Sequence, residues 1–339
     1  MPDHRLTLDR DRILAFRRHA GALDERLPPG ADSLRRAAWA GLQDSMPRAA
    51  LLSIHARVDG TEPTTLDDPS LVQIWGPRWG AFVVAASDLA VFTLGRMPTD
   101  ARDQAFAQGL ADDLEAFLGE RRLGYGEAGH GMGIPPNRLR YAAVTGRIVM
   151  RWDGARQPTI WMVPPPDSDP AEARLELARR YLHVFGPSSA ASFAQWAGTG
   201  ADGQTAFEAL RGERVPVRSP IGDAWILASD EPAFLSPASP STVVRLVPSG
   251  DTWFLLQGRD RELLVTDPGR RAELWTSRVW PGAVLLAGEV VGTWRRAQAT
   301  LSISTWRDLM PSERSAVEAE AASLPLPGIG RDIVVRWNE

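Results

Sequence analysis

The sequence contains no lysine and no cysteine. All 38 residues in the combined lysine and arginine count are arginines, and the cysteine count is zero. The protein therefore cannot form a lysine Schiff base, attack through a thiolate or bind zinc through cysteine. Any chemistry must come from carboxylates, amides, hydroxyls and five histidines. Codon bias in a GC-rich genome accounts for the missing lysine, and the chemical exclusions hold whatever the cause.

Long apolar runs and an excess of basic charge are also missing. No stretch has the roughly 18 consecutive apolar residues of a membrane span, and the first residues lack a signal-peptide pattern, so we expect a cytoplasmic protein. The net charge is −4, whereas a chain that wraps nucleic acid non-specifically is normally basic. Residues 134–156 nevertheless hold five arginines and a single acid, Asp153, which predicts a local basic face.

Metal and cofactor motifs are absent as well. The five histidines are scattered, and no two are four residues apart, so no metal site is expected. Residues 124–129 match G-x-G-x-x-G by letter but follow a predicted helix instead of a strand, which favours a plain loop over a dinucleotide site. No serine lies in a G-x-S-x-G elbow. We expect neither a metal nor a cofactor.

The length of 339 residues predicts several domains. Apolar spacing predicts helices over 7–28, 31–59 and 104–118, a strand over 81–84 and a helix from Ser87. A short helix over 136–145 and a hairpin, 147–152 with 158–163, then form a winged-helix pattern. The pattern recurs after Pro164–Pro166, with helices over 171–183, 191–197 and 205–210 and strands over 215–217 and 224–227.

From Ser241 the sequence changes to short strands, which predict a β-barrel or sandwich with one helix. The expected strands are 243–246, 253–257, 262–265, 283–287, 289–294, 301–306 and 332–337, and the helix is 312–322. The predicted fold is α+β, with tandem winged-helix domains followed by a C-terminal β-barrel-like domain. The predicted boundaries are 1–103, 104–166, 167–235 and 236–339.

Two segments are candidate sites. Gln43, Asp44 and Ser45 are the densest polar cluster in an otherwise amphipathic predicted helix, which fits either a solvated helical face or an amide and carboxylate that hold a water. Trp75 and Trp79 flank the turn at Gly76-Pro77-Arg78, and this arrangement fits either core packing or stacking on bases.

Long blocks of the sequence resemble the AlkZ/YcaQ family of winged-helix DNA glycosylases. The resemblance is strongest over residues 177–197, 257–265 and 279–296, and it extends to Gly41-Leu42-Gln43 and Ala56-Arg57-Val58. It implies three winged-helix domains around a DNA-sized concavity, with a β-barrel attached, and excision of alkylated purines, including bulky adducts and crosslinks. Double-stranded DNA is the implied partner, which implies a nucleoid-associated protein, and we expect a monomer.

The resemblance also implies a catalytic motif, Gln-apolar-Gln or Gln-apolar-Asp. Gln43 matches its first position, but Asp44 occupies the apolar middle position and Ser45 the third. On a helix a carboxylate shifted by one residue is rotated by about 100°. A second family segment, R-G-x-x-H, is matched by residues 78–82, with Phe82 where the histidine would be.

An alkylated purine is cationic and leaves readily, and a nearby carboxylate stabilises the sugar cation or activates water. We therefore expect Asp44 to be catalytic, Gln43 to orient the water and Ser45 to assist. The DNA contacts that we expect are Arg78, Trp79, Arg138, Arg140 and Arg147. Because a lyase needs an amine, and Met1 carries the only one, water is the expected nucleophile. The alternative is a non-catalytic winged-helix regulator or lesion-binding protein, which the altered motif and acidic net charge favour.

Overall fold

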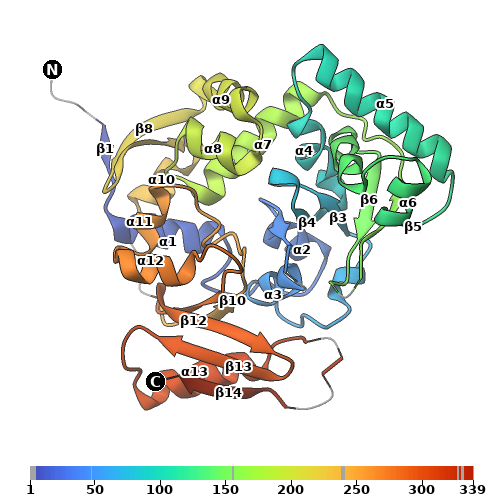
Figure 1. Cartoon of the computed structure of the whole chain (residues 1–339). Coiled ribbons are helices and arrows are strands. Elements are labelled where there is room, and N and C mark those ends of the chain that lie inside the picture. The colour runs from blue at the N-terminus through green and yellow to red at the C-terminus, as the bar shows by residue number, and fades with distance from the viewer. Residues whose placement is uncertain are drawn as a thin grey trace.

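The computed structural model describes residues 5–46, 48–154, 156–237, 241–326, 328–329 and 332–338. Figure 1 shows β8 with α8–α11 on one side, α5, α6 and β3–β6 on the other, and the last strands with α13 beneath. Within the described ranges, no helix is long and apolar enough to span a bilayer. Residue Met1, whose amine entered the sequence argument, lies outside the described residues.

The first half of the chain alternates short helices and strands. In order these are β1 (Leu6–Thr7), α1 (Arg10–Ala20), α2 (Ala31–Ala37), β2 (Leu42–Gln43), α3 (Ala49–His55), β3 (Leu71–Trp75), the 3₁₀ helix η2 (Pro77–Trp79), β4 (Ala81–Ala85), α4 (Leu89–Phe92), α5 (Ala101–Leu118), β5 (Leu123–Gly124), α6 (Tyr125–Gly131), the 3₁₀ helix η5 (Pro136–Thr145), β6 (Ile148–Arg151) and β7 (Thr159–Met162).

The second half begins with helices and ends mainly in strands. Its elements are α7 (Pro170–Phe185), α8 (Ala190–Ala197), α9 (Gly200–Ala209), β8 (Arg214–Ser219), β9 (Gly222–Leu227), α10 (Glu231–Leu235), β10 (Val244–Val247), α11 (Asp260–Leu264), α12 (Pro268–Leu274), β11 (Gly282–Leu286), β12 (Glu289–Ala297), β13 (Thr300–Thr305), α13 (Pro311–Ala322) and β14 (Val334–Asn338).

The predicted helix over 31–59 is wrong, because strand β2 interrupts it. Gly41 has a φ of 71°, and a Cβ there would lie about 3 Å from the rings of Phe92 and Phe82. The chain therefore turns at Gly41 and pairs with β4, with Leu42 opposite Val83 and Gln43 opposite Phe82. Tertiary pairing overrides the helical spacing of the apolar residues. The predicted helix over 7–28 is likewise shorter, since α1 ends at Ala20.

A six-stranded sheet, in the order β2-β4-β3-β6-β7-β5, crosses the predicted boundary at residue 103. Antiparallel pairing of Gln73 on β3 with Met150 on β6 joins the two parts. Helix α5 and η5 pack against this sheet, with Leu114, Leu139 and Ile148 fully buried between them. The parallel pairing of β1 with β8 similarly connects the N-terminal residues to the β8–β9 hairpin.

The C-terminal strands form an open sheet, β10-β11-β12-β13-β14, and not a closed barrel in the part of the chain that is described. Its two ends are β10 and β14, and β14 runs parallel to β13. Two of the strands expected from the sequence are wrong. Residues 253–257 contain turns, and 262–265 mostly lie in α11, whose last carbonyls accept from Arg10.

Candidate active site

Strand β2 separates the three residues of the polar cluster onto two faces. Successive side chains of a strand point to opposite faces, and the amide of Asp44 extends the ladder by donating to the carbonyl of Ala81 at 2.7 Å. Asp44 therefore shares the buried face with Leu42, and both are 1% exposed. Gln43 and Ser45 lie on the other face, where both line an open cavity of about 490 Å³ that we call the site cavity.

Gln43 and Ser45 act as one hydrogen-bonded pair. The Nε2 of Gln43 donates to the Oγ of Ser45 at 3.0 Å. The Oε1 of Gln43 is buried and has no hydrogen-bond partner among the described residues. An unsatisfied buried acceptor costs about 1–3 kcal/mol, and a rotation of the Gln43 side chain toward the cavity would let a bound molecule satisfy it.

Gly250 fits against Gln43 from the other half of the chain. A Cβ at residue 250 would lie 3.3 Å from the Cδ of Gln43 and 3.4 Å from its Oε1, and Gly250 has a φ of 78°. Only glycine combines this backbone conformation with so close an approach. Sequence reasoning missed Gly250, because no local pattern connects residues more than 200 positions apart.

The side chain of Asp44 forms its hydrogen bonds inside the protein. Its Oδ1 accepts from the backbone N–H of Ala50 at 3.0 Å, and its Oδ2 accepts from Nε2 of Gln73 at 2.6 Å. The Oε1 of Gln73 in turn accepts from the N–H of Trp152 at 2.5 Å. These bonds tie β2 to the start of α3, to β3 and to the end of β6. Burial raises the pKa of Asp44 to about 7, and the N–H of Ala50 partly opposes this shift.

The raised pKa predicts a pH-dependent stability difference between the wild type and the Asp44→Asn variant. In the unfolded chain an aspartate titrates near about 3.9. The folded state binds the proton more tightly, so this stabilisation is complete below about pH 4 and lost as the pH rises through about 7. The asparagine of the variant cannot titrate. We expect the stability of the wild type relative to Asp44→Asn to fall by a few kcal/mol between pH 5 and pH 8.

Urea unfolding at the two pH values measures this difference. Asp113→Asn, on an exposed position of α5, is the matched control. If the stabilities of the wild type and Asp44→Asn change in parallel between pH 5 and pH 8, the raised pKa of Asp44 is contradicted.

Two further cavities adjoin the site cavity. One, of about 460 Å³, shares Ser45 and Gly80 with it and is lined by aromatic side chains that include Trp75 and Trp152. The other, of about 360 Å³, shares Met46 and three residues from distant segments, namely Ser249, Val279 and Trp280. The three cavities together form one cleft along β2 and the β3–β4 turn. None of the described residues that line it is an aspartate or a glutamate.

The predicted pair Arg78 and Trp79 lies at this cleft. Both residues have left-handed backbone angles, with φ of 53° and 61°, in the turn between β3 and β4. Such conformations are strained outside glycine and are often found at functional sites. Arg78 lines the site cavity. The Trp79 ring lies between the guanidinium of Arg96, 4.7 Å away, and the ring of Tyr141, 5.1 Å away. Burial lowers the pKa of Arg96 to about 9.

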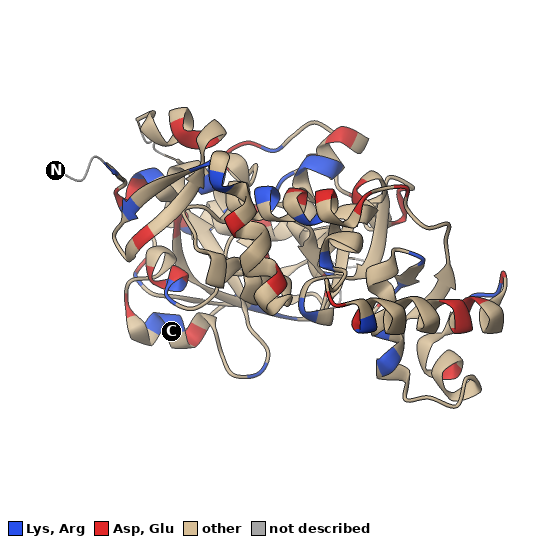
Figure 2. Cartoon of the chain, turned by 90° about the horizontal axis from the view of Figure 1, so that it is seen from above, with Lys and Arg blue, Asp and Glu red and all other residues tan. Residues whose placement is uncertain are grey.

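The other three predicted nucleic-acid contacts are separated from one another. Arg140 lines the aromatic end of the cleft, and Arg138 lies over the ring of Phe106 on α5. Arg147 forms ion pairs with Asp112 and Glu115 of α5. Figure 2 shows acidic and basic residues intermingled on the ribbon. The basic face expected over 134–156 is therefore partly neutralised by acids from elsewhere in the chain.

Phe82 packs in the interior. It is 1% exposed, and a Cβ on Gly76 would lie 2.8 Å from its ring. Phe82 lies in β4 opposite Gln43 and packs beneath the site. It supplies no polar group to the cleft, unlike the histidine of the family segment.

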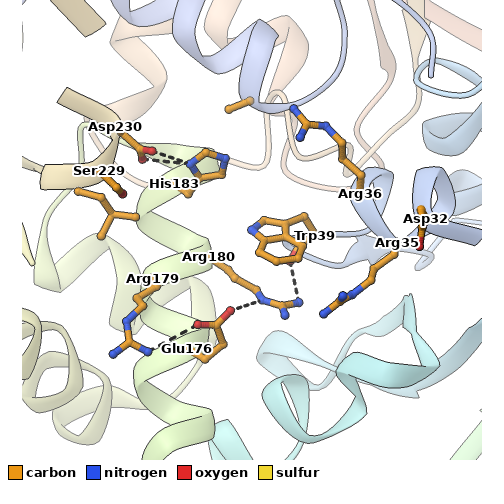
Figure 3. Close-up of a pocket in the computed structure, with 12 residues that line it drawn as sticks. Asp32, Arg35, Arg36, Trp39, Glu176, Arg179, Arg180, His183, Ser229 and Asp230 are labelled. Carbon is orange, nitrogen blue, oxygen red and sulfur yellow. Dashed lines mark hydrogen bonds and ion pairs between the residues drawn. The ribbon is translucent and has the colours of Figure 1, made fainter. Parts of the chain in front are cut away.

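A separate cavity of about 500 Å³ lies between α2 and α7 (Figure 3). The indole of Trp39 lies 3.9 Å from the guanidinium of Arg180 and 5.5 Å from that of Arg35. Both arginines form ion pairs with Asp88. The cavity contains none of the polar cluster at 43–45, and its paired arginines already have acidic partners, so we place the site in the β2 cleft.

Comparisons with known proteins give matches at the level of the family and of the fold. A family model described as DNA glycosylase AlkZ-like matches residues 36–325. Among solved structures, the Streptomyces sahachiroi DNA glycosylase AlkZ is similar, with a TM-score of 0.77 and 18% sequence identity, and the match covers 98% of this chain and 100% of that one. At this identity the likeness shows the fold. No curated protein sequence matches the chain. The region that the family model matches contains every residue that lines the cleft.

Proposed function

This chain belongs to the AlkZ-like DNA glycosylase family, and from that premise we propose that it hydrolyses the N-glycosidic bond of bulky N7-alkylated guanines in duplex DNA. The proposal includes crosslinked and intercalated adducts, and self-resistance to a DNA-alkylating natural product as the physiological role. We also propose that two parts of the fold act as winged helices that bind the duplex. One is helices α8 and α9 with the β8–β9 hairpin, and the other is η5 with the β6–β7 hairpin.

The observation that carries this proposal is an amide and a hydroxyl facing a cleft without carboxylic acids. A neutral purine needs a proton on its ring before it leaves, and an acid normally supplies it. The described lining of this cleft holds no aspartate or glutamate. A purine alkylated at N7 already carries the positive charge. The cleft therefore favours cationic leaving groups over neutral lesions.

The chemical step follows from the Gln43–Ser45 pair. The bond between C1′ and N9 breaks, its electron pair moves into the purine, and the ring loses its positive charge. A water held by the amide of Gln43 in the site cavity forms the new bond to C1′ and gives up one proton to solvent. The Oγ of Ser45 fixes the amide by accepting from Nε2. The partial negative charge of the Oε1 atom also favours the sugar cation.

We propose that Asp44 positions β2, which differs from the catalytic role expected from the sequence. Its carboxylate is buried and held by Ala50 and Gln73, so we assign it the positioning of β2, which orients its neighbours on either side. Family members with glutamine at the third position present two amides, and here Ser45 replaces the second with a shorter hydroxyl.

Contacts with DNA are assigned to side chains that lie at the cleft. Arg78 and Arg278 line the site cavity, and Arg140 lines the aromatic end of the cleft. A guanidinium binds phosphate through two parallel hydrogen bonds. Trp79, locked between Arg96 and Tyr141, supplies a rigid aromatic surface. Arg138 is assigned a peripheral phosphate contact, and Arg147 supports α5 through its ion pairs instead. The openness of the cleft favours excision of adducts that cannot rotate out of the helix.

Incubation with duplex DNA that contains N7-methylguanine or a bulky N7 adduct tests the function. We expect released base and an abasic strand that remains intact, since no lysine is present to attack the sugar. Borohydride should therefore trap no covalent complex. Duplexes with the neutral base hypoxanthine are the control and should be cleaved far more slowly. Tight, strongly salt-dependent binding without any abasic product supports the non-catalytic alternative.

A further inference from the structure

The cavity of about 360 Å³ beside the site cavity is lined mainly by apolar groups, and we call it the apolar cavity. Its volume is within the range of about 300–1,000 Å³ that holds small organic ligands. It lies between the start of α3 and the C-terminal sheet. Met46, Ser249, Val279 and Trp280 line both cavities. The two cavities are therefore neighbours that share one wall.

Two apolar side chains at the shared boundary are exposed. Met46 is 37% exposed and Val279 is 45% exposed. Large exposed apolar groups that gather at a hollow indicate a binding surface. Methionine beside an aromatic ring is well suited to flat ligands, because its thioether is polarisable and its side chain adapts.

The aromatic walls of the apolar cavity are held in place. The Nε1 of Trp294 donates to the carbonyl of Val247 at 3.1 Å, and the residue is buried. Trp280 lies against Arg261, whose guanidinium is 5.3 Å from its ring centre, and against Phe254 at 6.3 Å. A rigid aromatic wall binds a planar partner at a low cost in entropy.

The charges around the apolar cavity are basic. Arg295 and Arg296 line it and are exposed. Arg295 donates to the carbonyl of Val279 at 3.0 Å, which braces that segment. Arg278, which lines the neighbouring site cavity, is exposed and has no ion pair or hydrogen bond within the described part of the chain. This rim suits an uncharged aromatic group that arrives attached to anionic DNA.

We propose that the apolar cavity binds the planar, polycyclic aromatic body of an adduct bonded to guanine N7 when that body lies outside the base stack, and that Met46 and Val279 determine this specificity. The inference rests on the proposed function. N7 and N9 lie on the same five-membered ring of the purine, separated by one carbon, so a substituent on N7 stays close to the bond that is cleaved. A binding site for that substituent must therefore adjoin the site of hydrolysis, as the shared boundary does.

The experiment compares release of N7-methylguanine with release of the guanine N7 adduct of aflatoxin epoxide from the same duplex. The wild type should prefer the aromatic adduct. In the double variant Met46→Ser/Val279→Ser, the ratio of kcat/KM for the aromatic adduct to that for N7-methylguanine should fall at least tenfold. Val279→Ile should retain the ratio. The matched control is Met310→Ser/Val334→Ser, because both residues are exposed and lie outside the cleft.

The outcomes separate the two proposals. If the wild type releases neither base, the proposed function fails. If it releases N7-methylguanine but the double variant lowers both rates equally, the apolar cavity is structural and the inference is overturned. An unchanged ratio in a folded double variant also overturns it, whereas a selective loss on the aromatic adduct supports it.

Discussion

Replacing Gln43 with alanine should lower the rate constant of base release by about 100- to 1,000-fold, the usual effect of removing one preorganised group that acts in the transition state. The amide lines the site cavity and is the group proposed to hold the water. The side chain rests against Gly250, and its loss leaves the backbone pairing of β2 with β4 unchanged. Stability and DNA affinity should therefore change little.

Single-turnover release of N7-methylguanine, with affinity for abasic DNA measured in parallel, separates chemistry from binding. Ser45→Ala should lose about tenfold, since it removes only the hydrogen bond that orients the amide. The variant with both substitutions should resemble Gln43→Ala, because the two side chains act as a unit. Gln108→Ala, on an exposed position of α5, is the matched control. Wild-type release by a folded Gln43→Ala variant removes Gln43 from the mechanism.

Replacing Asp251 with alanine should destabilise the protein by about 3–5 kcal/mol, the cost of leaving a buried charge without its partner. The two terminal nitrogens of Arg57 donate to the carboxylate of Asp251 at 2.7 and 2.8 Å, and both side chains are buried. Arg57 also donates to the carbonyl of Ser53 at the end of α3. For a chain of this size, the melting temperature should fall by about 4–7 °C.

The same substitution should reduce base release even at temperatures where the variant is folded. Asp251 follows Gly250, and its Oδ1 accepts from the N–H of Trp253 at 2.8 Å, which fixes the turn against Gln43. The double variant Arg57→Met/Asp251→Leu should recover much of the stability, because it leaves no unpaired charge. Asp113→Ala is the exposed control. A melting temperature for Asp251→Ala within about 2 °C of the wild type, a shift too small for the cost above, contradicts this account.

The sequence predicts those helices and strands whose boundaries are marked by capping residues, turn residues or apolar alternation. Helix α7 begins at Pro170 after the capping Asp169 and ends before Gly186, and both boundaries are visible in the sequence. The hairpins β6–β7 and β8–β9 follow alternation and turn residues in the same way. The short apolar run at 262–265 predicts a strand, but residues 260–264 form helix α11, and the carbonyls of Leu263 and Leu264 accept from Arg10 of α1.

The candidate site was only partly predictable, because contacts between distant segments decide the conformation of its residues. The family resemblance located Gln43, and the segment 279–296 that carries the resemblance includes Val279 and Trp280. The helical interpretation of 31–59, however, gave Asp44 a rotation of about 100° from its neighbours, where a strand gives opposite faces. The difference moves the carboxylate from the cleft to the interior.

The sequence alone determined what this protein cannot do and where its motif lies. Without lysine or cysteine, amine and thiolate catalysis are excluded in any fold, because a missing functional group cannot be supplied by folding. Only the tertiary structure decided which side chains of the motif meet the cleft. Strand β2 is two residues long and has no conformation of its own; its face is set by pairing with β4, and its neighbour Gly250 comes from a segment about 200 residues away. Contacts between such distant segments leave no periodic trace in the sequence.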